Sequence, residues 1–183
     1  MSLTFSRRSF LKYTAVAAVA VAGSSLLTGC KDNPYQPTGT IGDKLSIMGD
    51  FTLLSKPAPT YADKKMTCNL VIECTSKRNL HVLPSCFQID VTSKDGKKVT
   101  TYSCDQNVNK KVSLENTDKD LAKDETLTTK LYVEEMNALE DGCKVEIKYW
   151  PRAQSSEGLL GYTEAYATWT MKYDAAKRAF VKV

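Results

Sequence analysis

The sequence predicts an all-β fold, an antiparallel β-sandwich of about seven strands that follows an N-terminal export segment. Three observations support this prediction. Short runs in which apolar and polar residues alternate recur from Ile41 to the end of the chain. Turn-forming residues such as Gly49, Asp95 and Gly96 interrupt or separate these runs, and no run is long and periodic enough for a stable helix.

The first 29 residues have the layout of an export signal. Arg7 and Arg8 give a positively charged beginning, and no charged residue occurs from Thr14 to Gly29, where small apolar residues dominate. A bilayer-spanning helix needs about 20 predominantly apolar residues. The apolar stretch here is shorter and rich in Ala, Gly and Ser. We therefore expect a helical signal segment that is removed, and not a permanent membrane span.

Two short motifs refine this interpretation. Ser6 to Lys12, with Arg7, Arg8, Phe10 and Leu11, resembles the twin-arginine signal S-R-R-x-F-L-K. Leu27 to Cys30 resembles a lipobox, the cleavage site of bacterial lipoproteins, which implies cleavage before Cys30 and lipid on its thiol. We expect a signal peptide over 1–29, a lipidated Cys30 with a tether over 30–42, and one β domain over 43–183. The chain would then be anchored to the extracytoplasmic face of a bacterial membrane, because two or more acyl chains give stable attachment.

Composition limits the possible partners. Arg7, Arg8 and Lys12 account for three of the four net positive charges, so the 154 residues from Cys30 onward carry a net charge of only +1. This balance argues against a nucleic-acid partner. Residues 31–40 contain two prolines and no apolar pattern, which indicates a tether between the lipid and the domain.

The predicted strands follow in order. They are 45–54 (broken at Gly49-Asp50), 65–75, 87–93, 97–104, 126–134, 143–150 and 163–173, with a possible edge strand at 179–183. Alternation assigns their faces. The residues predicted to face the core are Cys68, Leu70, Ile72, Cys74, Phe87, Ile89, Val91, Leu127, Thr129, Leu131, Val133, Cys143, Val145, Ile147, Tyr149, Ala165, Ala167, Trp169 and Met171. Their neighbours, including Cys86 and Asp90, are predicted to face water.

Three fragments carry a family resemblance. Ile41-Gly42-Asp43 precedes the first strand, Asn69 to Ser76 leads through Asn79 to Phe87-Gln88-Ile89 and Asp95-Gly96-Lys97, and 122–126 opens a strand that ends in Tyr132-Val133. This order resembles the telokin-like, immunoglobulin-like domains of bacterial secreted lipoproteins, which are related to the immunoprotective extracellular antigen of mycobacteria. The resemblance implies a sandwich fold and an extracytoplasmic location, and it implies no catalytic residues. The sequence departs from that pattern at Lys123-Asp124, where the family commonly has Pro-Gly, and in its cysteines and a long loop over 151–161.

Five cysteines besides Cys30 fall in a compartment where disulfides are expected. If Ser93 pairs with Lys97, Cys86 lies opposite Cys104 in one hairpin, at a separation that suits a bridge. Cys68 and Cys143 both point inward, near the starts of strands that lie in opposite sheets of an immunoglobulin-type sandwich. We predict Cys68–Cys143 and Cys86–Cys104, with Cys74 as a buried thiol. A Cys74–Cys86 bridge and a fully reduced set are the alternatives.

Catalytic motifs are absent from the sequence: there is no G-x-S-x-G, no H-E-x-x-H, no phosphate-binding loop and no EF-hand. The only histidine, His81, is expected in a solvated loop. Asp118, Asp120 and Asp124 could bind calcium, but a solvated acidic loop is the preferred interpretation because the spacing of a calcium loop is missing. We therefore expect no enzyme, no metal and no cofactor.

Aromatic residues suggest a binding surface. Trp150, Tyr162 and Tyr166 fall on outward or loop positions near 151–161. We expect a non-catalytic binding or interaction module that engages the lipid bilayer through Cys30 and an envelope protein as partner. The alternative is an accessory subunit of a twin-arginine-exported redox enzyme, which would be exported folded together with its cofactor-bearing partner.

Overall fold

The computed structural model describes residues 33, 35–47, 51–55, 59–75, 79–104, 111–116, 119–155, 158–161 and 165–183. Contacts divide the chain into two units, Met1–Lys31 and Asp32–Val183, and all the described residues belong to the second. The predicted signal helix over 1–29 and the lipidation site Cys30 lie outside the described residues. Within the described part of the chain the secondary structure consists of strands and one 3-10 turn, so the prediction of an all-β fold is confirmed.

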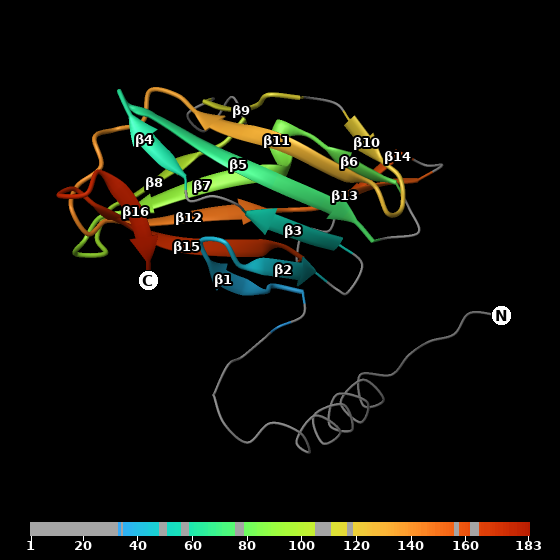
Figure 1. The fold of residues 1–183 in the computed structure, drawn as a ribbon, viewed down its shortest axis with the longest axis horizontal. Coiled ribbons are helices and arrows are strands. Elements are labelled where there is room, and N and C mark those ends of the chain that lie inside the picture. The colour runs from blue at the N-terminus through green and yellow to red at the C-terminus, as the bar shows by residue number, and fades with distance from the viewer. Residues whose placement is uncertain are drawn as a thin grey trace, which may run out of the picture. The chain divides into compact units, whose positions relative to one another are not determined.

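One six-stranded sheet contains most of the C-terminal strands (Figure 1). Its order is β1-β15-β12-β7-β8, and β16 also pairs with β15. The bounds are β1 Thr38–Thr40, β7 Phe87–Thr92, β8 Val99–Tyr102, β12 Lys144–Tyr149, β15 Ala167–Asp174 and β16 Ala179–Lys182. Strand β12 occupies one edge of β15, so β1 and β16 share the other edge, β1 at Thr168 to Thr170 and β16 at Met171 to Asp174.

The second six-stranded sheet has the order β2-β3-β5-β11-β9, with β4 paired to β5 beyond the end of β3. Its strands are β2 Lys44–Ile47, β3 Phe51–Ser55, β4 Thr60–Ala62, β5 Lys65–Cys74, β9 Val112–Leu114 and β11 Thr126–Val133. The break predicted at Gly49-Asp50 separates β2 from β3, which pair antiparallel. The residues of the break itself, 48–50, lie outside the described part.

A third, smaller sheet has the order β10-β6-β13-β14. Its strands are β6 Leu80–Val82, β10 Lys119–Leu121, β13 Arg152–Ser155 and β14 Gly158–Gly161, and the 3-10 turn η1, Pro84–Cys86, connects β6 to β7. The prediction of a long loop over 151–161 is therefore wrong, because β13 and β14 form an antiparallel pair within this range.

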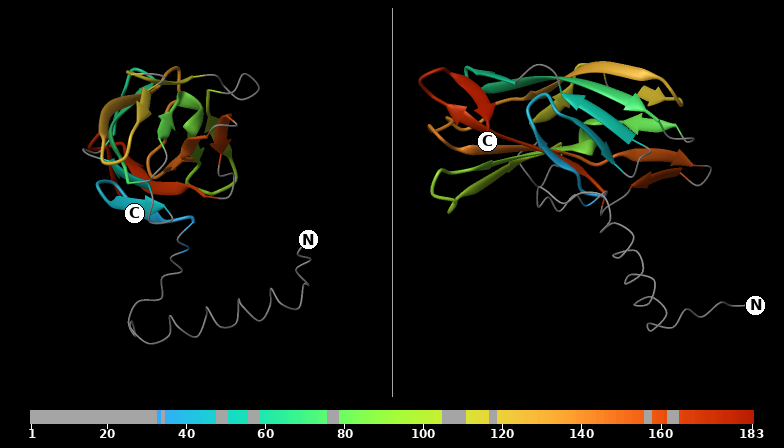
Figure 2. Two further views of the ribbon diagram at one scale, coloured as in Figure 1. Left: turned by 90° about the vertical axis from the view of Figure 1, so that its right-hand side faces the viewer. Right: turned by 60° about the horizontal axis from the view of Figure 1, so that its bottom comes forward.

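The core confirms the alternation of the long strands. In β5 every second residue from Met66 to Cys74 is buried, and β11, β12 and β15 bury the side chains predicted from the sequence. Buried residues of both six-stranded sheets belong to one hydrophobic cluster. Seen end-on, the strands surround this interior (Figure 2, left). Because β5 and β11 pair over eight residues in register, Leu70 and Thr129 lie opposite each other on the buried face.

Two predictions about strand arrangement are wrong. Strand β1 runs parallel to β15, so the architecture is not antiparallel throughout, and Thr38 to Thr40 form a strand although they were predicted as part of the tether. The β7–β8 register also differs by one residue: Ser93 pairs with Lys98 and not with Lys97, and Ile89 lies opposite Tyr102. The turn thus holds four residues, and Gly96 adopts the expected positive φ of 74°.

Candidate binding surface

Trp150 and Tyr166 form a cross-strand aromatic pair. Strands β12 and β15 pair in register up to Tyr149 and Ala167, and the next residues, Trp150 and Tyr166, continue this register. Their ring centroids lie 5.0 Å apart and the rings are tilted by 34°. Tyr149 and Ala167 point into the core, so alternation directs Trp150 and Tyr166 outward, where both remain partly exposed. The structure thus brings together two of the three predicted binding residues; Tyr162 lies outside the described residues.

Backbone hydrogen bonds fix the place of this pair. The Trp150 amide donates to the Cys86 carbonyl at 2.8 Å, and the Tyr166 amide donates to the Tyr35 carbonyl at 2.8 Å. The Thr168 amide donates to the Pro37 carbonyl at 3.0 Å, just before β1 begins. Residues 35–37, which lead into β1 and are called the N-terminal segment below, therefore lie beside the aromatic pair. Tyr35 itself is 52% exposed, which makes it one of the three most exposed large hydrophobic residues in the described part of the chain.

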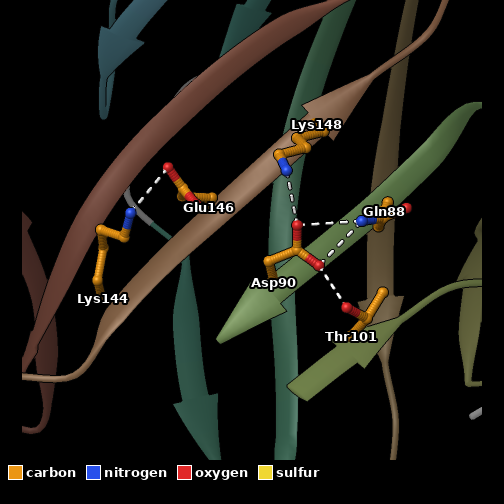
Figure 3. A network of polar contacts seen from close by, with 6 residues as sticks. All are labelled: Gln88, Asp90, Thr101, Lys144, Glu146 and Lys148. Atoms are coloured by element: carbon orange, nitrogen blue, oxygen red, sulfur yellow. Dashed lines mark hydrogen bonds and ion pairs between the residues drawn. The ribbon is translucent and has the colours of Figure 1, made fainter. Parts of the chain in front are cut away.

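A polar network lies farther along the outer face of the same sheet (Figure 3). The Asp90 carboxylate on β7 accepts hydrogen bonds from Lys148 Nζ at 2.7 Å, from Thr101 Oγ1 at 2.7 Å and from Gln88 Nε2 at 2.9 and 3.0 Å. These donors come from three neighbouring strands, β12, β8 and β7. Next to them, Lys144 Nζ lies 3.2 Å from Glu146 Oε1.

The ionisation of this network follows from its contacts. Burial raises the pKa of Asp90, but the hydrogen bonds from Lys148, Thr101 and Gln88 outweigh burial, and the pKa lies below its ordinary value. Burial lowers the pKa of Lys148, while the contact with Asp90 raises it, and the net shift is upward. Both groups are charged at neutral pH. A carboxylate with its oxygens occupied and a low pKa is a poor general base, so the network serves to join three strands.

His81 lies in a strand and not in the predicted solvated loop. It is the central residue of β6, opposite Asp120 of β10, and its Nδ1 contacts Asp120 Oδ1. Asp120 was considered as a calcium ligand together with Asp118 and Asp124; Asp118 lies outside the described residues. In the part of the chain that the structure describes, no three His, Cys, Asp or Glu side chains come together as a metal site would require.

Neither predicted disulfide is formed in this structure. Cys86, Cys104 and Cys143 are thiols, which leaves both Cys68–Cys143 and Cys86–Cys104 unbridged, as well as the alternative Cys74–Cys86. The premise for Cys86–Cys104 is wrong because the paired residues of β7 and β8, with Ile89 opposite Tyr102, are shifted by one residue from the register that this bridge assumed. Cys86 is also buried and not on the wet face, since it ends the 3-10 turn and its Sγ donates to the His81 carbonyl at 3.7 Å. Cys74 is buried, as predicted.

The buried Tyr149 hydroxyl and one small cavity do not form a catalytic or ligand-binding site. Burial raises the pKa of Tyr149 well above its ordinary value, so its hydroxyl stays neutral at physiological pH. A cavity of about 70 Å³ lies between the β7–β8 hairpin and residues 137–143 and is lined by Val91, Tyr102, Leu139 and Cys143 among others. It could hold about two water molecules and is far smaller than a typical small-molecule site.

Comparison with known proteins identifies the beginning of the chain. Residues 4–24 match the family model of the twin-arginine translocation (TAT) pathway signal sequence. The chain carries a twin-arginine export signal. This signal implies export across the cytoplasmic membrane, and the matched segment includes the predicted residues Arg7, Arg8, Phe10 and Leu11. In the described part of the chain, no helix is long and apolar enough to cross a bilayer.

Further comparisons are distant. No curated protein matches the chain. Among solved structures, the chain is similar to the crystal structure of a "putative lipoprotein" (YcdA) from Bacillus subtilis subsp. subtilis str. 168, with a TM-score of 0.40 and 16% sequence identity. The similarity covers 67% of this chain and 36% of that one, so the chain spans about a third of the length of the protein it matches.

The sequence could not reveal two features of this surface. Gln88, Asp90 and Lys148 were assigned to the outer face, but the contact of Lys148 with Asp90 depends on the pairing of β7 with β12. The contact of Thr101 with Asp90 depends on the β7–β8 register, which a one-residue change in turn length shifts. The contact between Tyr35 and Tyr166 joins residues 131 positions apart, and nothing local in the sequence indicates it.

Proposed function

We propose that this protein is an extracytoplasmic lipoprotein, anchored through an acylated Cys30, whose immunoglobulin-like domain is a non-catalytic binding module with Trp150 and Tyr166 in its binding surface. The observation that carries the proposal is the partly exposed aromatic pair at the end where the N-terminal segment joins the domain. Aromatic side chains offer a large contact area with little loss of conformational entropy, which suits a recognition surface.

The order of the strands supports the immunoglobulin-like interpretation. Variable-type immunoglobulin domains combine strands A-B-E-D in one sheet with G-F-C-C′ in the other. The order β3-β5-β11-β9 in one sheet and β15-β12-β7-β8 in the other corresponds to these two sets. The parallel pair β1–β15 and the third sheet are additions to that plan.

The anchor is supported by the sequence around Cys30. Leu27 to Cys30, which resembles a lipobox, follows the matched export signal at residues 4–24. The described domain begins only a few residues later, so a lipid on Cys30 would hold the aromatic pair close to the membrane. The non-catalytic role is supported by Asp90, whose oxygens accept hydrogen bonds from three side chains, and by Tyr149, which is fully buried.

Site-specific photo-crosslinking on intact cells tests the proposal. A photoreactive amino acid replaces Tyr166 in one variant and Ala176 in a matched control, because Ala176 is exposed in the turn at the other end of β15. We expect an envelope component to be captured from position 166 and not from 176, and mass spectrometry then identifies it as protein or lipid. Identical products at both positions, or none at 166, would overturn the binding surface. A cofactor-bearing protein captured from 166 would instead favour the accessory-subunit function.

A further inference from the structure

The N-terminal segment joins the domain at one defined end. Strand β1 is parallel to β15 and starts at Thr38, opposite Thr168, so the residues just before it lie at the start of β15. The hydrogen bonds from Tyr166 to Tyr35 and from Thr168 to Pro37 hold them there. The same end carries Trp150, whose ring packs on Tyr166. Three aromatic residues and the beginning of the domain therefore share one location.

Chain length limits how far this end can lie from a lipid on Cys30. Tyr35 is the fifth residue after Cys30, and an extended chain spans at most about 3.6 Å per residue, or roughly 18 Å over these five steps. The headgroup region occupies several ångströms on each side of the hydrocarbon core, since it accounts for the difference between about 30 Å and about 40–45 Å of total thickness. A domain held by this segment has its aromatic end within reach of the headgroups, whatever conformation the segment adopts.

The side chains at this end have the chemistry of a bilayer interface. Tyr and Trp are enriched at headgroup level because their rings are apolar while their O–H and N–H groups remain polar. Arg152 follows Trp150 by two residues and is partly exposed. A guanidinium group suits lipid phosphates. The turn at the other end of β15 instead carries the ion pair Lys177–Asp174 and exposed Ala175 and Arg178, without an aromatic residue.

We propose that Tyr35, Trp150 and Tyr166 rest against the headgroup region of the bilayer and so set the orientation of the domain on the membrane. This inference rests on the proposed anchor at Cys30 and names the bilayer surface as the occupant of the aromatic end. The long axis of β15 would then lead away from the membrane, and the turn at 175–178 would face outward, available to other envelope components.

Tryptophan fluorescence can test the contact because the chain has only two tryptophans, Trp150 and Trp169. Trp169 is buried in the core, 1% exposed, and donates its Nε1–H to the Asp43 carbonyl, so it should not respond to lipid. The processed protein, which begins at Cys30 and is purified with its lipid, is inserted into vesicles of phosphatidylglycerol and phosphatidylethanolamine. The vesicles contain lipid spin-labelled either near the headgroup or near the end of the acyl chain. Trp150→Phe provides the matched control and leaves the core tryptophan in place.

We expect spin label near the headgroup to quench part of the wild-type emission, label deep in the bilayer to quench less, and neither to quench Trp150→Phe. Equal emission with and without label in the wild type would overturn the inference. A circular dichroism spectrum equal to that of the wild type shows that the variant is folded, and quenching that persists in a folded Trp150→Phe would overturn it too. The mass of the Cys30 peptide in the same sample separates the two failures. Unmodified Cys30 overturns the anchor and with it this inference, whereas acylated Cys30 without quenching overturns this inference alone.

Discussion

Lys148 Nζ lies 2.7 Å from Asp90 Oδ2, and this contact joins the two central strands on the outer face of the β12 sheet. The Asp90 side chain is only 8% exposed and that of Lys148 is 24% exposed. Gln88 and Thr101 supply the remaining hydrogen bonds to the carboxylate. A carboxylate this well enclosed stabilises the fold only while its hydrogen-bond partners are present. Removing either Asp90 or Lys148 leaves the remaining charge partly desolvated and without a counter-charge, which lowers the free energy of unfolding.

Asp90→Asn should lower the free energy of unfolding by about 2 kcal/mol, since the substitution removes a charge-assisted hydrogen bond and leaves Lys148 without its counter-charge. Urea denaturation with an unchanged m value measures this loss. Glu134→Gln is the matched control, because Glu134 pairs with Lys65 at 3.0 Å on the exposed surface and should contribute less than about 0.5 kcal/mol. Equal effects of both substitutions would mean that the Asp90 network is an ordinary surface contact.

The same network predicts a pH dependence. The pKa of Asp90 is lowered in the folded state, so its contribution is fully present above the unfolded value of about 3.9 and is lost as pH falls through the folded pKa. The pKa of Lys148 is raised, so its contribution is present below about 10.4 and is lost as pH rises through the folded value. The stability difference between wild type and Asp90→Asn should therefore stay constant from about pH 5 to 9 and shrink below about pH 4. A difference that vanishes near neutral pH would contradict this assignment.

Gly39→Ala should loosen the attachment of the N-terminal segment. A Cβ at position 39 would lie 2.9 Å from Leu45 Cδ2 and 3.0 Å from Asp43 Oδ2, which accepts a hydrogen bond from the Thr40 amide. We expect a destabilisation of about 1–3 kcal/mol, as for other overpacked sites. Faster hydrogen exchange at the Thr168 amide, which donates to Pro37, would locate the change. Thr38→Ala, on an exposed position of the same strand, should have little effect; if it costs as much as Gly39→Ala, close packing at Gly39 is not the cause.

The cysteines should differ in their rates of alkylation in the folded protein. Burial raises the pKa of Cys86 and Cys143, which keeps both thiols protonated, whereas Cys104 is partly exposed. Cys104 should therefore react with iodoacetamide well before the other two, as peptide mass spectrometry can follow. A Cys86–Cys104 crosslinked peptide in the exported protein under non-reducing conditions would contradict the arrangement described here.

The long strands were predictable because their alternation spans many residues. Apolar and polar residues alternate over the ten residues of β5 and the eight of β11, and only one choice of buried face places the apolar set inside. Strands of three residues, such as β1, β4, β6, β9 and β10, are too short to show a period, and β1 depends on the distant strand β15 for its pairing. The face of Cys86 was mispredicted because the 3-10 turn interrupts the alternation that begins at Phe87.

The candidate surface was predictable only in part. Trp150 and Tyr166 could be assigned to outward positions, because their neighbours are apolar and alternate with them. Their direct contact depends on the β12–β15 register, and the position of Tyr35 beside them depends on the parallel strand β1. The disulfide prediction failed at the hairpin because three-residue and four-residue turns are both compatible with Ser93 to Lys98, and a one-residue shift moves every partner.

Attachment of the exported chain to the membrane beside its aromatic end depends first on Cys30. The most direct test is mass spectrometry of the N-terminal peptide of the processed protein, recovered from the membrane fraction of cells that export it. We expect a peptide that begins at Cys30 and carries the added mass of a diacylglycerol group. A chain cleaved elsewhere, with an unmodified Cys30 and recovered in the soluble fraction, would contradict it.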